Sequence, residues 1–212
     1  MFKKIPFIYA LCLFIGLQLY AQEKQNNLSI KISIDQSQQK NFEKKGRIFV
    51  FLTQNSKLEP RNQIWPNPYQ KTHIFAQNID HFSPKKSIEL NGQDKWTKTP
   101  EWSLNSIPAG TYYVQVVWDQ DIKESRINAP SNLYADKQKI LIDGDQELSF
   151  IFNKKYKPRT IKEHPLAKLV DLKSDTLSSW WAHDMNLKAS VLLPHNYDKN
   201  KAYPIRYNVA GY

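Results

Sequence analysis

Few side chains in this sequence are arranged for acid–base or metal chemistry. His183 and Asp184 are adjacent and follow two tryptophans, and a His–Asp pair is the usual base and orienting acid behind a catalytic nucleophile. Adjacent residues of an extended segment point to opposite sides, which favours a turn over a catalytic pair. The other histidines lack metal-ligand spacing, and side chains so dispersed are usually exposed. They are His73, His81, His164 and His195.

A group of carboxylates at Asp119, Asp121 and Glu124 falls in an expected loop and could bind Ca²⁺. The stretch lacks the glycine and the terminal glutamate of a recognised calcium-binding loop. We therefore predict no metal site and no cofactor, and we assign no catalytic residue.

Four aromatic residues fall in stretches rich in Pro and Asn, outside the clearest strands. They are Trp65, Tyr69, Trp96 and Trp102. Exposed rings can stack on the apolar C–H faces of sugars, which would make carbohydrate a partner. The alternatives are rings that cap the ends of a sandwich core, or rings that form a domain interface. The sequence leaves these interpretations open.

The net charge is +10, from 30 basic and 20 acidic residues, and such a charge attracts polyanions. The lysines are dispersed, however, without an arginine-rich helix, a long basic tract or a nucleic-acid-binding motif. The composition therefore favours a solvated basic surface and predicts no nucleic-acid partner.

Residues 1–21 have the pattern of a bacterial secretory signal peptide, with Lys3 and Lys4 before an apolar run over 5–17. The run is short for a membrane span, so we expect no stable span after cleavage and a secreted or periplasmic location. An uncleaved anchor is the alternative. Cleavage would remove Cys12, the only cysteine, so the core alone would have to stabilise the mature chain.

Residues 22–153 show short strand patterns separated by turns. Leu28 to Ile34 alternates apolar and polar side chains, and 47–53 is more uniformly apolar. Further strands are expected at 72–79, 86–90, 111–118, 139–142 and 147–152. Asp143-Gly144-Asp145-Gln146, between the last two, favours a hairpin turn. Without a convincing helical period, the sequence predicts an antiparallel β-sandwich of the immunoglobulin-like or prealbumin-like kind.

Residues 154–165 are rich in Lys and Pro and poor in apolar side chains, which predicts a linker. Strands are then expected at 166–172, 187–193 and 205–209. The second of these runs into Pro194, a polar turn follows, and Tyr203-Pro204 leads into the third.

Four segments resemble secreted bacterial esterases of the esterase D type, in which a β-sandwich domain precedes an α/β-hydrolase domain. The segments are GRIFVFL at 46–52, IPAGTYYVQVVWD at 107–119, APSNLY at 129–134, and KASVLLP at 188–194 with YPI at 203–205. The resemblance implies a mainly β chain, with a sandwich at 22–153 and the first strands of a truncated α/β-hydrolase sheet at 166–212. It also implies hydrolysis of a carboxylic ester by a Ser–His–Asp triad.

The resemblance places only the oxyanion loop in this chain, at Gly211 and Tyr212, where the family's frequent His-Gly is replaced by Ala210-Gly211. The nucleophile requires Gly-x-Ser-x-Gly, and no two of the six glycines are spaced around a serine in this way. We therefore expect the N-terminal fragment of a serine esterase, inactive alone, whose ester substrate is bound by the missing hydrolase portion. The alternative is a non-enzymatic envelope or glycan-binding sandwich protein.

Overall fold

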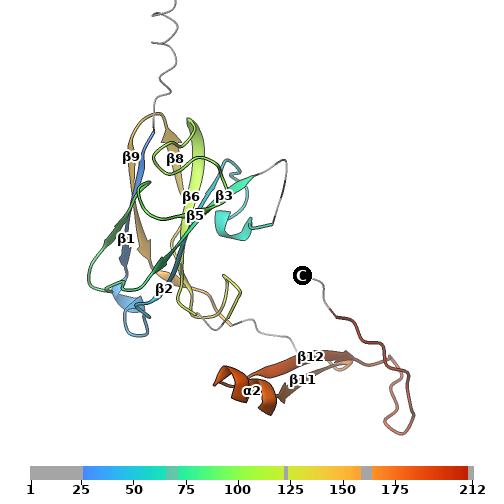
Figure 1. The fold of residues 1–212 in the computed structure, drawn as a ribbon. Helices are drawn as coiled ribbons and strands as arrows, with labels where there is room; N and C mark the ends of the chain where they lie inside the picture. The colour runs from blue at the N-terminus through green and yellow to red at the C-terminus, as the bar shows by residue number, and fades with distance from the viewer. Residues whose placement is uncertain are drawn as a thin grey trace, which may run out of the picture. The chain divides into compact units, whose positions relative to one another are not determined.

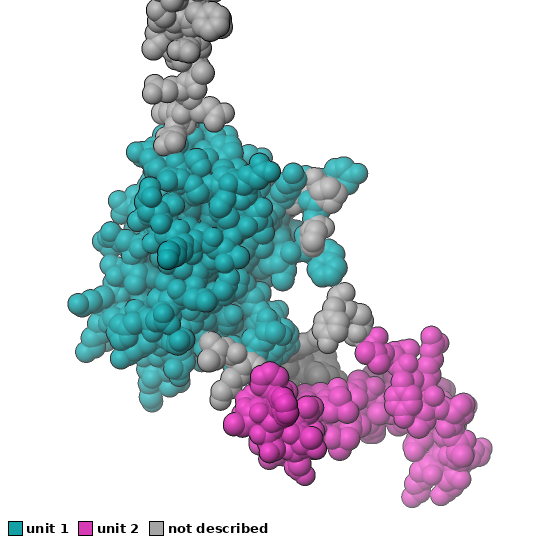
Figure 2. Space-filling model, viewed as in Figure 1, with its two compact units in different colours: residues 1–158 teal, residues 159–212 magenta. Residues whose placement is uncertain are grey.

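The structure is a computed structural model that describes residues 26–65, 67, 69, 71–121, 124–158 and 164–209. The chain divides into two compact units, residues 1–158 and 159–212, which are described separately (Figure 2). The described part is mainly β (Figure 1). The predicted signal peptide, residues 1–21, lies outside the described residues.

The first unit is a β-sandwich whose smaller sheet has the strand order β4-β1-β9. β1 (Leu28–Ile34) lies between β4 (Ile88–Leu90) and β9 (Gln146–Phe152). β4 pairs with β1 in the antiparallel direction, whereas β9 runs parallel to β1 along the full length of both strands. The smaller sheet is therefore mixed, and a parallel neighbour of β1 requires that the chain cross from the other sheet.

The larger sheet has the order β10-β7-β6-β2-β3-β5, and β8 pairs with the first half of the long strand β6. Every pairing in this sheet is antiparallel. Its strands are β2 (Gly46–Thr53), β3 (Thr72–Ile79), β5 (Thr97–Lys98), β6 (Gly110–Asp119), β7 (Leu133–Tyr134), β8 (Gln138–Ile142) and β10 (Lys154–Lys155). Two short 3-10 helices lie in connections: η1 (Gln36–Gln38) between β1 and β2, and η2 (Pro60–Asn62) between β2 and β3.

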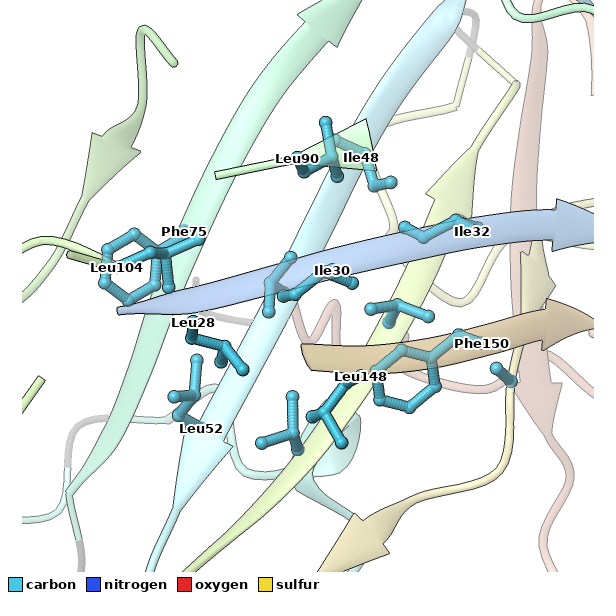
Figure 3. Packing of buried hydrophobic residues seen from close by; sticks show 14 of the residues in the cluster. Leu28, Ile30, Ile32, Ile48, Leu52, Phe75, Leu90, Leu104, Leu148 and Phe150 are labelled. Atoms are coloured by element: carbon cyan, nitrogen blue, oxygen red, sulfur yellow. The ribbon is translucent and has the colours of Figure 1, made fainter. Parts of the chain in front are cut away.

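The core lies between the two sheets, where alternate side chains of each strand meet. Leu28, Ile30 and Ile32 on β1 are at most 1% exposed, while the residues between them face outward. They share one apolar cluster with Ile48 and Leu52 of β2, over which β1 crosses in Figure 3. Full burial of one such side chain contributes about 1.5–3 kcal/mol, so the alternation decides which face of each strand turns inward.

The predicted hairpin at 143–146 is wrong, because the strands on either side of this turn belong to different sheets. β8 pairs with β6 in the larger sheet, and β9 pairs with β1 in the smaller one. Asp145 fixes the crossing, since its Oδ1 accepts hydrogen bonds from the backbone N and the Nδ2 of Asn27, at 3.0 and 2.7 Å. The turn residues favoured a reversal of the chain, and burial of Leu148, Phe150 and Phe152 in the core selected the partner strand.

The sandwich continues into the stretch 154–165 that the sequence suggested as a linker. Lys154 and Lys155 form β10, whose backbone pairs with β7. Tyr156 N then donates to the carbonyl of Asn132 at 3.0 Å, and the boundary between the two units follows Pro158. Backbone pairing at a sheet edge does not require apolar side chains, and lysines are common on edge strands.

The second unit contains a two-stranded antiparallel sheet of β11 (Ala167–Lys173) and β12 (Asn186–Leu192), joined through the helix α2 (Asp175–Trp181). The Ser174 hydroxyl caps the helix by accepting a hydrogen bond from Leu177 N at 3.3 Å. Among the residues that the structure describes, no helix is long and apolar enough to cross a membrane.

The strand expected at 205–209 is absent from the described part of the second unit, because residues 202–209 have no regular secondary structure. A strand is defined by its pairing with a neighbour, and among the described residues no other strand pairs with β11 or β12. Ile205, Tyr207 and Val209 are 74%, 84% and 93% exposed. The apolar alternation was present in the sequence, but the described residues provide no neighbouring strand for it.

Removal of a core side chain should destabilise the sandwich far more than removal of an outward one. Ile30→Ala should lower the free energy of unfolding by about 2–5 kcal/mol, because Ile30 is fully buried. Leu141→Ala on β8 is the control, since Leu141 is 57% exposed and its loss should cost about 0.5 kcal/mol or less. Urea unfolding followed by tryptophan fluorescence measures both, and equal losses would contradict the placement of β1.

Candidate functional site

A groove of about 780 Å³ lies beside the start of β3, between the segment that precedes this strand and the loop 99–102. β5 pairs with β3 only at Phe75 and Ala76, so residues 72–74 form a sheet edge on that side. Two hydrogen bonds between Ile74 and Thr99, at 2.9 and 3.0 Å, hold the loop against this edge. The walls combine apolar and polar side chains, among them Gln63, Ile64, Trp65, Thr72, His73 and Trp102.

Of the four aromatics singled out in the sequence, Trp65 and Tyr69 are the exposed ones. Trp65 lines the groove with 78% of its surface exposed. Tyr69 is 93% exposed and lines a neighbouring hollow, which shares Lys71 and His73 with the groove. The structure therefore places Trp65 in the groove and Tyr69 beside it.

Trp102 and Trp96 are both half-buried and pack on the same core residue, Phe75. Their ring centroids lie 5.5 and 5.9 Å from that of Phe75. Trp102 also meets the His73 ring edge-on at 4.7 Å and lines the groove. Trp96 does not line the groove, and its Nε1 donates to the carbonyl of Asn91 at 2.8 Å. Trp96 is thus a cap on the core, whereas Trp102 connects the core to the groove.

Two polar atoms at the groove have no hydrogen-bond partner among the described residues. They are Nε2 of Gln63 and Oγ1 of Thr72, and both are buried. A buried polar group without a partner costs about 1–3 kcal/mol. In a native structure, groups of this kind are accounted for by water, by a ligand or by strain.

The charges around the groove are balanced. Lys71 and Glu101 contribute one charge of each sign. Burial, and then the charge of Lys71, hold the pKa of His73 below its ordinary value, so this imidazole is neutral near pH 7. A neutral imidazole offers one donor and one acceptor, and the site as a whole favours an uncharged ligand.

Gln115 anchors the segment that carries residues 63–65. Its side chain is fully buried on β6, where Oε1 accepts from the backbone N of Arg61 at 3.2 Å. Its Nε2 donates to Glu59 Oε2 at 2.8 Å and to the carbonyl of Ala135 at 2.9 Å. One amide thus connects η2 with the strands beneath it, and it fixes the start of the chain that reaches the groove.

Arg61 completes this anchor. Its guanidinium lies 4.0 Å from the ring centroid of Tyr134 and 5.6 Å from that of Tyr156, and its Nη1 pairs with Glu59 at 2.5 Å. Stacking of this kind stabilises by about 0.5–2 kcal/mol. Burial raises the pKa of Tyr156 to about 12, so its phenol stays protonated. These contacts hold Arg61 in a structural role, so its guanidinium is not available as a catalytic cation.

The other candidate groups found in the sequence do not come together as sites. Asp184 forms an ion pair with Lys173 at 2.7 Å, and the hydrogen bond and charge of this lysine lower the pKa of the carboxyl. His183 Nδ1 lies 3.2 Å from the backbone oxygen of Asp184, so the two side chains form no catalytic pair. In the described ranges, no cluster of three or more His, Cys, Asp or Glu could hold a metal ion.

Among the carboxylates considered for Ca²⁺, Asp119 accepts a hydrogen bond from Asn132 Nδ2 at 2.8 Å, and burial raises its pKa. Asn132 Oδ1 also accepts from the backbone N of Gln120 and Asp121, so this amide organises the loop. The oxyanion-loop candidates Gly211 and Tyr212 lie outside the described residues.

Comparison with known proteins gives no relative: no family model, no curated protein and no solved structure matches this chain. The interpretation of the groove therefore depends on its own geometry. Gln63, Thr72 and His73 were not singled out as groove residues from the sequence, because no motif marks a polar atom whose partner is missing.

The anchor at Glu59 should make part of the stability depend on pH. Burial raises the pKa of Glu59, but hydrogen bonds from Gln115 and Arg61 outweigh it and hold the pKa below its ordinary value. A carboxyl with a lowered folded pKa stabilises the protein above its unfolded pKa of about 4.3, and this contribution is lost as the pH falls through the folded value.

Glu59→Gln should therefore lose stability relative to the natural chain at pH 6 and approach it at pH 3. Melting temperatures between these pH values measure the difference. Glu147→Gln is the matched control, because Glu147 is exposed on β9 and makes no ion pair among the described residues. A constant difference across the range would contradict the ionised anchor.

Proposed function

We propose that this chain forms the N-terminal region of a secreted serine esterase, a carboxylic ester hydrolase. The sandwich is its accessory domain, and residues 166–212 begin its catalytic sheet. The observation that supports this most is the apolar face of the β11–β12 hairpin, which the described residues leave uncovered. The hairpin lies where the sequence resembles the first strands of an esterase D-type hydrolase.

Five side chains make one face of this hairpin apolar. Strand alternation and register place Val170 opposite Ala189 and Leu172 opposite Leu187, with Val191 on the same face. None of the five is buried, and Leu172 and Leu187 are 57% and 65% exposed. A two-stranded sheet is at best marginally stable by itself in water. The proposal therefore requires further protein that covers this apolar face.

The helix α2, between the two strands, also exposes large apolar side chains. Leu177, Trp180 and Trp181 of α2 are 49%, 82% and 59% exposed. Large apolar side chains gathered on one small unit are typical of a surface that other protein buries. In the proposed enzyme, the rest of the hydrolase sheet and its helices provide that cover.

Ester hydrolysis by such an enzyme requires a serine on a sharp strand-to-helix turn, a histidine base and a carboxylate that orients the histidine. The printed sequence contains no Gly-x-Ser-x-Gly. In the proposal, these groups come from the hydrolase portion that completes the sheet. The present chain supplies at most backbone N–H groups of the oxyanion hole, at Gly211 and Tyr212.

The purified 212-residue chain should hydrolyse p-nitrophenyl acetate no faster than buffer and should not react with a serine-directed fluorophosphonate. The coding sequence after Tyr212 should encode Gly-x-Ser-x-Gly, then Asp, then His, in the order of α/β-hydrolases. The product that contains both parts should react with the probe at that serine, and its Ser→Ala variant is the control. Labelling of the 212-residue chain, or a stop codon with no related frame beyond it, would refute the proposal.

A second candidate is a non-enzymatic, glycan-binding sandwich of the cell envelope. The observation that favours it is the groove at Trp65 and Trp102, which combines aromatic rings with unpartnered polar atoms. The two candidates differ in what they require of the second unit: only the esterase needs a larger sheet to form on β11 and β12.

A further inference from the structure

We propose that the groove beside β3 binds a neutral carbohydrate, with Trp65 and Trp102 stacking on sugar rings and with Gln63 and Thr72 hydrogen bonding to sugar hydroxyls. This inference concerns the sandwich alone. It rests on the second candidate function, whose ligand class and binding residues it specifies, and it holds or fails independently of the esterase proposal.

The two tryptophans supply complementary parts of a stacking surface. Trp102 is held by Phe75 and His73, with ring centroids 5.5 and 4.7 Å away, so it cannot turn freely. Trp65 is 78% exposed, so most of its ring can be covered by a ligand. One face of a pyranose is lined by C–H groups and its rim by hydroxyls, a combination that matches an aromatic wall with polar neighbours.

The unpartnered polar atoms explain why the ligand should carry hydroxyls and not only apolar groups. Gln63 Nε2 is a donor, and Thr72 Oγ1 can donate and accept. Both residues line the groove, while the two atoms themselves are buried in the free chain. A ligand therefore reaches either atom only when the side chain turns to another rotamer. A sugar hydroxyl would supply the partner that each atom lacks in the free chain, which favours binding.

The electrostatics favour a neutral sugar over a uronic acid or a phosphate. Lys71 and Glu101 oppose each other in charge, and His73 is uncharged near pH 7. Arg61 does not line the groove, and its guanidinium is paired with Glu59 and stacked on Tyr134. The groove volume of about 780 Å³ is within the ordinary range of small-ligand sites.

Isothermal titration calorimetry of the purified chain tests the inference with cellohexaose, xylohexaose, mannohexaose and maltohexaose, and with hexagalacturonate as the charged comparison. At least one neutral hexasaccharide should bind with a Kd below about 1 mM. Trp65→Ala should weaken that binding at least about tenfold, as expected for a central aromatic contact. Trp180→Ala is the matched control, since it removes a tryptophan of similar exposure from the other unit and should change the Kd less than about twofold.

Thr72→Val separates binding from folding. The hydroxyl has no partner among the described residues, so its removal should leave the melting temperature unchanged or raised. The same variant should weaken sugar binding about threefold or more. A variant that loses stability and binding together would show that the hydroxyl serves the fold, and would overturn its role in the groove.

Three other results would overturn the proposal. The first is no measurable heat with any neutral hexasaccharide at millimolar concentration. The second is tighter binding of hexagalacturonate than of every neutral sugar. The third is equal affinity of the natural chain and Trp65→Ala.

Discussion

Burial of alternate side chains between the two sheets is the constraint on which the sandwich depends. The only cysteine, Cys12, precedes the described residues, so no disulfide supports them. The stability must come from the apolar cluster that β1 and β9 share with the larger sheet. This requirement also explains the parallel pairing of β1 with β9: the chain crosses between sheets so that Leu148, Phe150 and Phe152 reach the same core.

The outer face of the larger sheet depends on that core for its position. Gln115 lies on the strand whose inward residues close the core, and its amide holds η2 in place. From η2 the chain continues to Gln63 and Trp65, while Phe75 fixes Trp102 from the other side. The groove is therefore built by buried groups, although its ligand-facing residues are partly exposed.

The sequence predicted the longer strands of the sandwich well, and at 28–34 the period-two alternation reports burial on one face. It could not predict the partner of β9, since the turn at 143–146 is compatible with a hairpin and with a crossing. Nor could it find the unpartnered atoms of Gln63 and Thr72, which depend on packing between distant segments. The expectation at 205–209 failed for the opposite reason: the local pattern was clear, but the described part of the chain gives it no partner strand.

The two units thus differ in one physical respect. The first unit contains a buried apolar core. In the described part of the second unit, no residue of β11, β12 or α2 is buried. Hydrogen–deuterium exchange of the purified chain tests this directly. Amides of β1, β2 and β6 should be protected, while those of β11 and β12 should exchange at least about 100-fold faster, as expected for strands without buried side chains. Equal protection in the two units would contradict the account, because it would show that residues 166–192 are stable without further protein.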